Sequence, residues 1–306
     1  MSPATSDEPN DTTEESHQEG PPPESQMDTQ RSYTDIFYNQ LQEGMRTLNR
    51  PAAGQFVSSV SCGLDISLGP FMMIAMLTSL SGAVADPIAH AIMPILYTFG
   101  FLFVILGRSE LFTEHTTLAV LPVLDGRDSI SNLARLWTLV YSGNIIGGTV
   151  AAVFVGWATV ALGVIKPKYL VDTGMTFIDL SPQGVFAGAI LAGWLMGLLS
   201  WILTSVGDTI SRIAVIVAVT YLIGFAHMPH CVAGNIEVIA AMMAGAPISV
   251  AQWGQFLALT SVGNAIGGVV FVSLVKYGHV TFGSKEPDLD DEVRQGGPSI
   301  DSMTDD

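Results

Sequence analysis

Charged residues are scarce in this sequence. Only 13% of the 306 residues are Asp, Glu, Lys or Arg, 49% are apolar, and the mean hydropathy is +0.44. A soluble domain usually carries about 25% charged residues, so the composition argues against a soluble enzyme. Only 12 residues are Lys or Arg, and they form no basic patch that could meet phosphates. A nucleic-acid-binding protein is therefore excluded.

Cysteine is also rare. Cys62 and Cys231 both lie in apolar stretches, and two such residues cannot form a disulfide framework or indicate a redox compartment.

The acidic residues that are present gather at the two ends. Residues 1–35 hold nine acids and one base, residues 286–306 hold eight acids and one base, and the net charge of the chain is −16. Both segments have almost nothing to bury, so we expect them to be disordered acidic tails. The nearly neutral stretch 36–285 between them is the predicted transmembrane transport domain.

This central stretch contains long apolar segments. A membrane-spanning helix needs about 20 mostly apolar residues. Four segments meet this length: 57–80, 133–164, 184–206 and 254–275. Before them, Phe37, Leu41, Met45 and Leu48 form one apolar stripe over 36–50, which predicts an interfacial helix leading into the membrane.

Two further apolar segments are short and interrupted. Residues 93–107 stop at Arg108 and resume over 118–124, and residues 213–226 stop at His227 and resume over 236–244. Each first part is too short to cross alone. We therefore predict two discontinuous membrane helices, which brings the number of crossings to six.

An internal repeat relates the two halves of the chain. The segment SGNIIGG at 142–148 returns as VGNAIGG at 262–268, an offset of 120 residues. The alternative is that the motif recurs by chance, because Gly-rich faces are common where membrane helices pack. The same offset places Glu110 over His230, so the interrupted segments should superpose without a gap. Halves of about 36–165 and 166–285, with three crossings each, must then run in opposite directions.

Inverted repeats with two interrupted helices at matching positions are typical of transport folds whose site lies near the middle of the membrane. The sequence thus predicts an all-α membrane protein with six transmembrane helices, of which the second and fifth are broken. Orientation follows the basic residues. With both termini in the cytoplasm, the outer side receives only Lys166 and Lys168, and the inner side receives Arg46, Arg50, Arg127, Arg135, Arg212 and Lys276.

Polar and ionisable residues gather at the two breaks. Ionisable side chains are costly inside a membrane and usually mark a pathway. The residues at the breaks are Arg108, Glu110, Thr113, Glu114 and His115 from one half, and His227, His230, Asn235 and Glu237 from the other. A bare small anion costs on the order of 20 kcal/mol to move through apolar surroundings, whereas a protonated weak acid avoids most of this. Histidine exchanges its proton readily near neutral pH. The residues therefore indicate passage of a small weak-acid anion, with a histidine giving and retrieving the proton.

Several of these residues have a structural alternative. Arg108 and Glu110 either form an ion pair or line the pore. His115 and Glu114 fit a role in stabilising the break, and His90 fits an interfacial position. We expect only one of His227 and His230 to line the pore.

Three motifs resemble the formate/nitrite transporter family over residues 33–280. They are GRSELFTE at 107–114, VYSGN at 140–144, and His230 followed by Gly234, Asn235 and Glu237. The resemblance implies an aquaporin-like protomer, a homopentamer in the plasma membrane, and one pore in each protomer with two constrictions around a central histidine. It places that histidine at His230 and its threonine partner at Thr113. It places the constrictions at Leu111, Phe112, Tyr97 and Phe101.

The sequence also departs from the family pattern. Gly234 stands where well-studied formate channels carry an asparagine, with Asn235 adjacent, and Arg108 replaces a small residue. These changes alter the polar partners of His230 and the charge of the pore mouth, and they point to a less characterised branch. His227 matches a similar local pattern, so it is the alternative candidate for the central histidine, and His230 is preferred.

The preferred function is a channel or proton-coupled carrier for small monovalent anions such as formate or nitrite, with no cofactor or metal. A neutral-solute channel of aquaporin type is the alternative, although the paired Asn-Pro-Ala motifs of such channels are missing from the sequence. A membrane-embedded metalloenzyme using His115, His227, His230 and Glu237 is the third possibility, because zinc takes three or four such ligands.

Overall fold

The computed structural model describes residues 32–283, and helices account for most of them. The disorder predicted for the tails therefore falls outside the described residues, apart from 32–35. These four residues are ordered because Ser32 caps the first helix. The Ser32 side chain accepts from the Asp35 N–H at 3.1 Å, and the Asp35 carboxylate accepts from the Ser32 N–H at 3.3 Å. This capping box starts the helix three residues earlier than the apolar stripe suggested.

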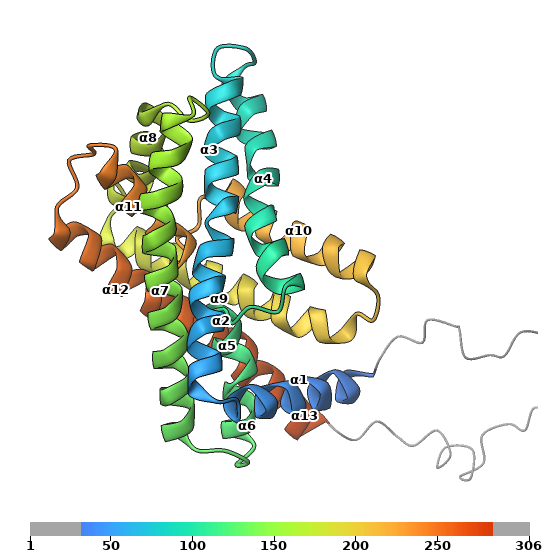
Figure 1. The fold of residues 1–306 in the computed structure, drawn as a ribbon. Coiled ribbons are helices and arrows are strands. Elements are labelled where there is room, and N and C mark those ends of the chain that lie inside the picture. The colour runs from blue at the N-terminus through green and yellow to red at the C-terminus, as the bar shows by residue number, and fades with distance from the viewer. Residues whose placement is uncertain (1–31, 284–306) are drawn as a thin grey trace, which may run out of the picture. The chain divides into compact units, whose positions relative to one another are not determined.

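The helices follow one another along the chain with short connections (Figure 1). In order they are α1 (Tyr33–Leu48), α2 (Ala52–Ile66), α3 (Leu68–Leu80), α4 (Asp86–Leu106), α5 (Phe112–Leu118), α6 (Val120–Leu124), α7 (Ile130–Ala161), α8 (Pro167–Ile178), α9 (Pro182–Ser205), α10 (Thr209–Phe225), α11 (Ala233–Met243), α12 (Val250–Gly268), the π-helix η2 (Val269–Leu274) and α13 (Val275–Gly283).

Within the described residues, five helices or joined helices are long and apolar enough to cross a membrane. They are Ala52–Leu80, Asp86–Leu106, Ile130–Ala161, Pro182–Ser205 and Val250–Gly283. Apolar side chains also cover outward faces: Phe154 and Trp157 of α7 are 63% and 67% exposed. Large apolar surfaces of this kind are stable in lipid rather than in water.

The prediction that residues 93–107 are too short to cross alone is wrong. Helix α4 begins at Asp86 and has 21 residues. Asp86 and Pro87 extend the helix beyond the apolar run, because an acid and a proline both suit the first helical turn. Helix α10 has 17 residues and remains the short one. It begins at its cap Asp208, where hydrogen bonds from Ser211 hold the pKa of the Asp208 carboxyl below its ordinary value.

Both interruptions expected from the sequence are present. The chain leaves the helix between Leu106 and Phe112, and again between Phe225 and Ala233. Helical structure resumes earlier than predicted, at Phe112 instead of 118 and at Ala233 instead of 236. The polar residues at 113–117 are helical because the surrounding protein buries them: Thr113, Thr116 and Thr117 have no exposed surface.

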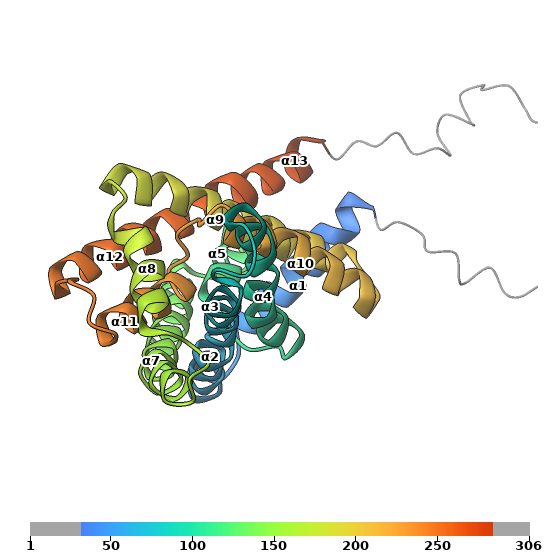
Figure 2. The same ribbon diagram turned by 90° about the horizontal axis from the view of Figure 1, so that it is seen from above.

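Glycines allow two equivalent helix pairs to pack closely. Helix α2 lies along α7, and α9 lies along α12 (Figure 2). A β-carbon on Gly63 would lie 2.4 Å from the Asn144 carbonyl oxygen, and one on Gly193 would lie 2.1 Å from the Asn264 carbonyl oxygen. The repeat seen in the sequence therefore extends to the contacts between helices.

The first and last described helices lie together (Figure 1). The Tyr33 hydroxyl donates to the Lys276 carbonyl at 3.4 Å, and Phe37 and Leu41 pack in a cluster with Trp201 and Val272. Helix α1 therefore rests its apolar stripe on the protein body. Met45, predicted to belong to this stripe, is only partly buried.

Candidate functional site

His230 and Thr113 bring the two interruptions together. The Thr113 hydroxyl and His230 Nε2 lie 2.9 Å apart, and neither residue has exposed surface. Thr113 is the second residue of α5, and His230 lies in the segment just before α11. Two residues 117 positions apart in the chain thus share one hydrogen bond inside the protein.

The other ring nitrogen of His230 faces backbone donors. The N–H groups of Val232 and Ala233 both lie 3.3 Å from Nδ1. Nδ1 therefore serves as the acceptor, which assigns the proton of a neutral imidazole to Nε2. That proton points at the Thr113 hydroxyl oxygen.

Aromatic rings surround this histidine on the side of α4. The Phe101 ring meets the His230 ring edge to face at a centroid distance of 5.4 Å, and Tyr97 lies 5.4 Å from Phe101. Of the four proposed constriction residues, Phe101 thus contacts His230, and Tyr97 contacts Phe101.

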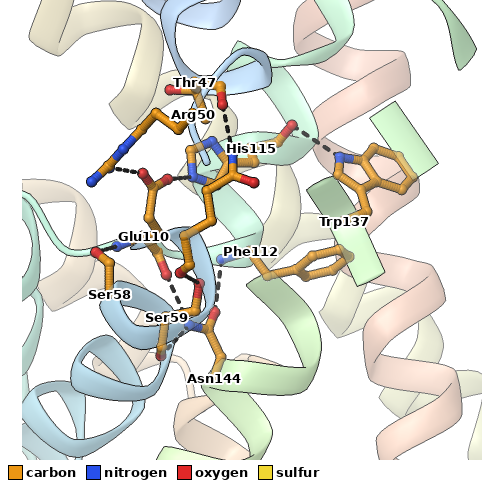
Figure 3. A network of polar contacts seen from close by, with 10 residues as sticks. Thr47, Arg50, Ser58, Ser59, Glu110, Phe112, His115, Trp137 and Asn144 are labelled. Atoms are coloured by element: carbon orange, nitrogen blue, oxygen red, sulfur yellow. Dashed lines mark hydrogen bonds and ion pairs between the residues drawn. The ribbon is translucent and has the colours of Figure 1, made fainter. Parts of the chain in front are cut away.

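The other two proposed constriction residues lie at the start of α5. Leu111 is the residue just before this helix, and Phe112 is its first residue. Leu111 is fully buried. Phe112 turns toward α7, with ring centroids 5.8 Å from Trp137 and 5.1 Å from Tyr141. Figure 3 shows Phe112 directed at Trp137.

Glu110 is the centre of a second polar cluster (Figure 3). One carboxylate oxygen pairs with Arg50 and the other with His115 Nε2. Glu110 and His115 are both buried, and the Trp137 N–H donates to the His115 carbonyl at 3.2 Å. His115 Nδ1 is buried without a partner among the described residues. The interpretation of His115 as a stabiliser of the break fits this geometry.

Arg108 does not form the ion pair with Glu110 that the sequence left open. Both ion-pair contacts of Glu110 go to Arg50 and His115. The side chain of Arg108 instead lines a cavity of about 650 Å³, together with Glu110, His115 and Arg212. Sequence reasoning missed Arg50 as a site residue, and its position directly before Pro51 carries no signal that could have identified it.

The remaining candidates lie on the second interruption. The Asn235 side-chain oxygen accepts from the Trp253 indole N–H at 2.8 Å, while its amide nitrogen is buried without a partner among the described residues. Glu237 is also buried. His227 faces His90 with ring centroids 6.3 Å apart. Across residues 32–283, no group of three or more His, Cys, Asp or Glu side chains could hold a metal ion.

Asn144 and Asn264 make contacts with the interruptions that the repeated sequence motif did not reveal. Asn144 Oδ1 accepts from the Phe112 N–H, and its amide donates to the carbonyls of Ser59 and Glu110. Asn264 Oδ1 accepts from the Cys231 N–H, and its amide donates to the carbonyls of Ala189 and Pro229. The two asparagines therefore hold the two interruptions in the same way.

These contacts correct the superposition expected from the sequence. Asn144 and Asn264 are 120 residues apart, but their partners Phe112 and Cys231 are 119 apart. Glu110 therefore matches Pro229, and Leu111 matches His230. The gap-free offset was wrong by one residue because the segment between the break and the third helix of each half differs in length.

The fold and the site define a class of membrane protein. Two interrupted helices meet inside an apolar helical bundle around a buried histidine, as in transport proteins with a site at the repeat interface. Comparison with known proteins then identifies the family. Residues 34–278 match the family model described as formate/nitrite transporter, and the chain belongs to this family of membrane channels and transporters.

Similar proteins agree with this assignment. The chain is 31% identical over 249 residues to the inner membrane protein YfdC of Escherichia coli (strain K12), covering 78% of this chain and 76% of the relative. A solved FNT family ion channel has the same fold, with a TM-score of 0.70 at 22% identity over 80% of this chain and 98% of that one. A pentameric formate channel with formate bound matches with a TM-score of 0.61 at 21% identity, covering 74% of this chain and 96% of that one.

Proposed function

We propose that this protein passes small monovalent weak-acid anions, such as formate or nitrite, across the membrane, and that His230 handles the accompanying proton. The hydrogen bond between His230 Nε2 and Thr113 is the observation that carries the proposal. It places an ionisable ring at the junction of the two interruptions. The family membership and the formate-bound fold relative support the substrate class.

The surroundings of His230 support transport of a protonated species. Phe101 packs against the His230 ring, Tyr97 packs against Phe101, and all three residues are buried. An anion that enters such an apolar passage loses hydration, at a cost on the order of 20 kcal/mol for a bare ion. Taking up a proton removes most of this cost, because the neutral acid is only weakly hydrated.

The surroundings of the two ring nitrogens of His230 determine which nitrogen can donate a proton. An imidazolium that gives its Nε2 proton to an anion keeps its other proton on Nδ1. The N–H groups of Val232 and Ala233 point at that atom from 3.3 Å. We infer that these two contacts lengthen when His230 takes up a proton on Nδ1, before Nε2 donates to the anion, and that the Thr113 hydroxyl holds the ring in place.

The pentameric fold relative supports a proposal for the assembly, and the distribution of basic residues supports one for the orientation. We propose a homopentamer in the plasma membrane with both termini in the cytoplasm. The exposed apolar face of α7, which includes Phe154 and Trp157, suits contact with lipid or with a second copy. Cross-linking of the purified protein in detergent tests the number of copies.

Uptake of labelled formate and nitrite into proteoliposomes tests the function. We expect uptake above that of protein-free vesicles, and faster uptake with an inward proton gradient. His230→Ala should alter the dependence on the gradient, while His279→Ala, on the exposed end of α13, serves as a histidine control. Equal uptake with and without the gradient would contradict proton coupling.

Two further outcomes are decisive. If His230→Ala keeps the pH profile of the unaltered protein and His227→Ala loses it, the proton is handled by His227. If glycerol enters the vesicles as fast as formate does, the neutral-solute channel is the correct function.

A further inference from the structure

Arg108 and His227 occupy the same unusual position in the two halves of the protein. Their φ angles are 56° and 47°, and they are the only residues other than glycine with positive φ in the described part of the chain. A β-carbon disfavours this left-handed conformation. Strained backbone at matching positions of two repeats points to a role for the side chains that are kept there.

The same turn produces both conformations. After α4, the Arg108 N–H donates to the Ile105 carbonyl at 3.3 Å and the Ser109 N–H to the Val104 carbonyl at 3.0 Å. After α10, the His227 and Met228 N–H groups make the same two bonds, at 3.2 and 3.0 Å. This is a Schellman motif, whose left-handed position is usually glycine.

Each of these residues lies near a second residue of its own kind. Arg108 and Arg212, which is in the first turns of α10, line the same cavity of about 650 Å³. His227 faces His90, which is in the first turns of α4, with the rings edge to face at 6.3 Å. The Tyr221 hydroxyl donates to the Ala91 carbonyl at 3.1 Å and holds α10 against α4 beside these rings.

The two pairs lie at opposite ends of the bundle. His90 and Arg108 are 18 residues apart on and just beyond α4, which at 1.5 Å per residue separates them by about 27 Å. We call the end with Arg108 and Arg212 the near mouth, because residues of α1 line its cavity. The end with His90 and His227 is the far mouth.

The charges around each pair differ. At the near mouth, other ionisable side chains line the cavity: Glu43, Arg46, Arg50, Glu110, Glu114 and His115. At the far mouth, among the described residues, the His90 ring faces His227, and Asp86 lies one helical turn before His90. His90 is exposed to the surroundings and His227 is partly buried.

We propose that His227, with the His90 ring beside it, forms a second anion-binding site at the far mouth, and that His227 supplies positive charge there in acid. Its ligand is the small monovalent carboxylate or oxyanion of the proposed function, on which this inference rests. Arginine stays protonated at every physiological pH, whereas histidine gains its charge between about pH 5 and 8. The near mouth therefore attracts anions at all pH values, and the far mouth attracts them when its side of the membrane is acidic.

Formate uptake into proteoliposomes that contain the full chain tests this site, with the apparent KM measured between external pH 5.5 and 8. Dividing each variant's KM by that of the unaltered protein cancels the protonation of formate itself. For His227→Arg the ratio should be near one in acid and fall to roughly one fifth at pH 8, the size of one screened charge interaction. For His227→Gln it should be raised in acid and return to one at pH 8.

Three variants control for other effects. His227→Gly removes the imidazole but suits the left-handed backbone, so it keeps the test valid if His227→Gln does not fold. His90→Gln should shift the ratio in the same direction as His227→Gln. Arg108→Gln should raise KM by the same factor at every pH.

The possible results separate this site from the proposed function. Ratios that do not change with pH, or effects on the maximal rate with KM unchanged, would overturn the far-mouth site while transport itself stands. Absence of formate and nitrite uptake by the unaltered protein would overturn the proposed function and this site together.

Discussion

Asn144 and Asn264 hold the two helix interruptions with the same set of hydrogen bonds. Each side chain accepts one backbone N–H, at 2.8 Å in both cases, and donates to two backbone carbonyls. Neither residue has exposed surface. Unpaired backbone groups are costly inside a membrane, so these asparagines make the interruptions possible.

Replacing either asparagine by alanine should destabilise the protein strongly. Asn144→Ala and Asn264→Ala each leave two backbone groups of an interruption without partners, at about 1–3 kcal/mol per group. They are the Phe112 N–H and Glu110 carbonyl in one case, and the Cys231 N–H and Pro229 carbonyl in the other. Thermal unfolding in detergent measures the loss. Asn49→Ala is the control, because Asn49 is exposed and bonds only to the nearby Met45 carbonyl. A melting temperature for Asn144→Ala equal to that of Asn49→Ala would show that the breaks are held by other contacts.

Thr113→Val should change transport rather than folding. Valine has the shape of threonine but removes the hydroxyl that contacts His230 Nε2, an interaction worth about 1 kcal/mol. We expect a roughly fivefold change in uptake rate and an altered pH profile. Thr220→Val is the matched control, because its buried hydroxyl bonds only within its own helix, to the Ile216 carbonyl. The same profile in both variants would remove Thr113 from the site.

Glu110 and His115 should be energetically coupled. Their side chains pair inside the protein, with 5% and 4% of their surface exposed. A double-mutant cycle with Glu110→Gln and His115→Gln should give a coupling energy of about 0.5–3 kcal/mol, as expected for buried partners. The exposed pair Glu43 and Arg46 is the reference, with an expected coupling of about 0–1 kcal/mol. Additive effects at Glu110 and His115 would contradict the contact in Figure 3.

Gly63→Ala and Gly193→Ala should separate the paired helices. The new β-carbons would lie 2.4 and 2.1 Å from backbone oxygens of α7 and α12, and a backbone cannot yield as a side-chain tip does. We expect a loss of roughly 1–3 kcal/mol or more from overpacking, measured as a lower melting temperature. Gly54→Ala and Gly254→Ala meet nothing within 4 Å and should be neutral or gain up to about 1 kcal/mol from helix propensity.

Some elements of the fold could be read from the sequence because their signals are local. The breaks at Arg108 and His227 follow from polar residues that end apolar runs, and the repeat follows from the spacing of the two GN motifs. The start of α4 at Asp86 could not be read from hydropathy, since the helix includes polar residues that suit its first turn.

The site was only partly predictable for the same reason. The motifs pointed to His230 and Thr113 as partners, but Arg50 pairs with Glu110 across 60 residues of chain, and no local pattern links the two. Phe112 was expected at a constriction, and the structure directs its ring toward Trp137 and Tyr141. Such directions depend on side chains from other helices.

The sequence by itself determined that this is a helical membrane protein built from two related halves, each with an interrupted segment. Long apolar runs and their spacing are properties of the chain alone, because the cost of placing charge in lipid acts on each segment separately. The tertiary structure decided which polar groups meet: Thr113 with His230, Glu110 with Arg50 and His115, and His227 with His90. Hydrogen bonds and ion pairs need atoms within a few ångströms, and only the packing of distant segments sets those distances.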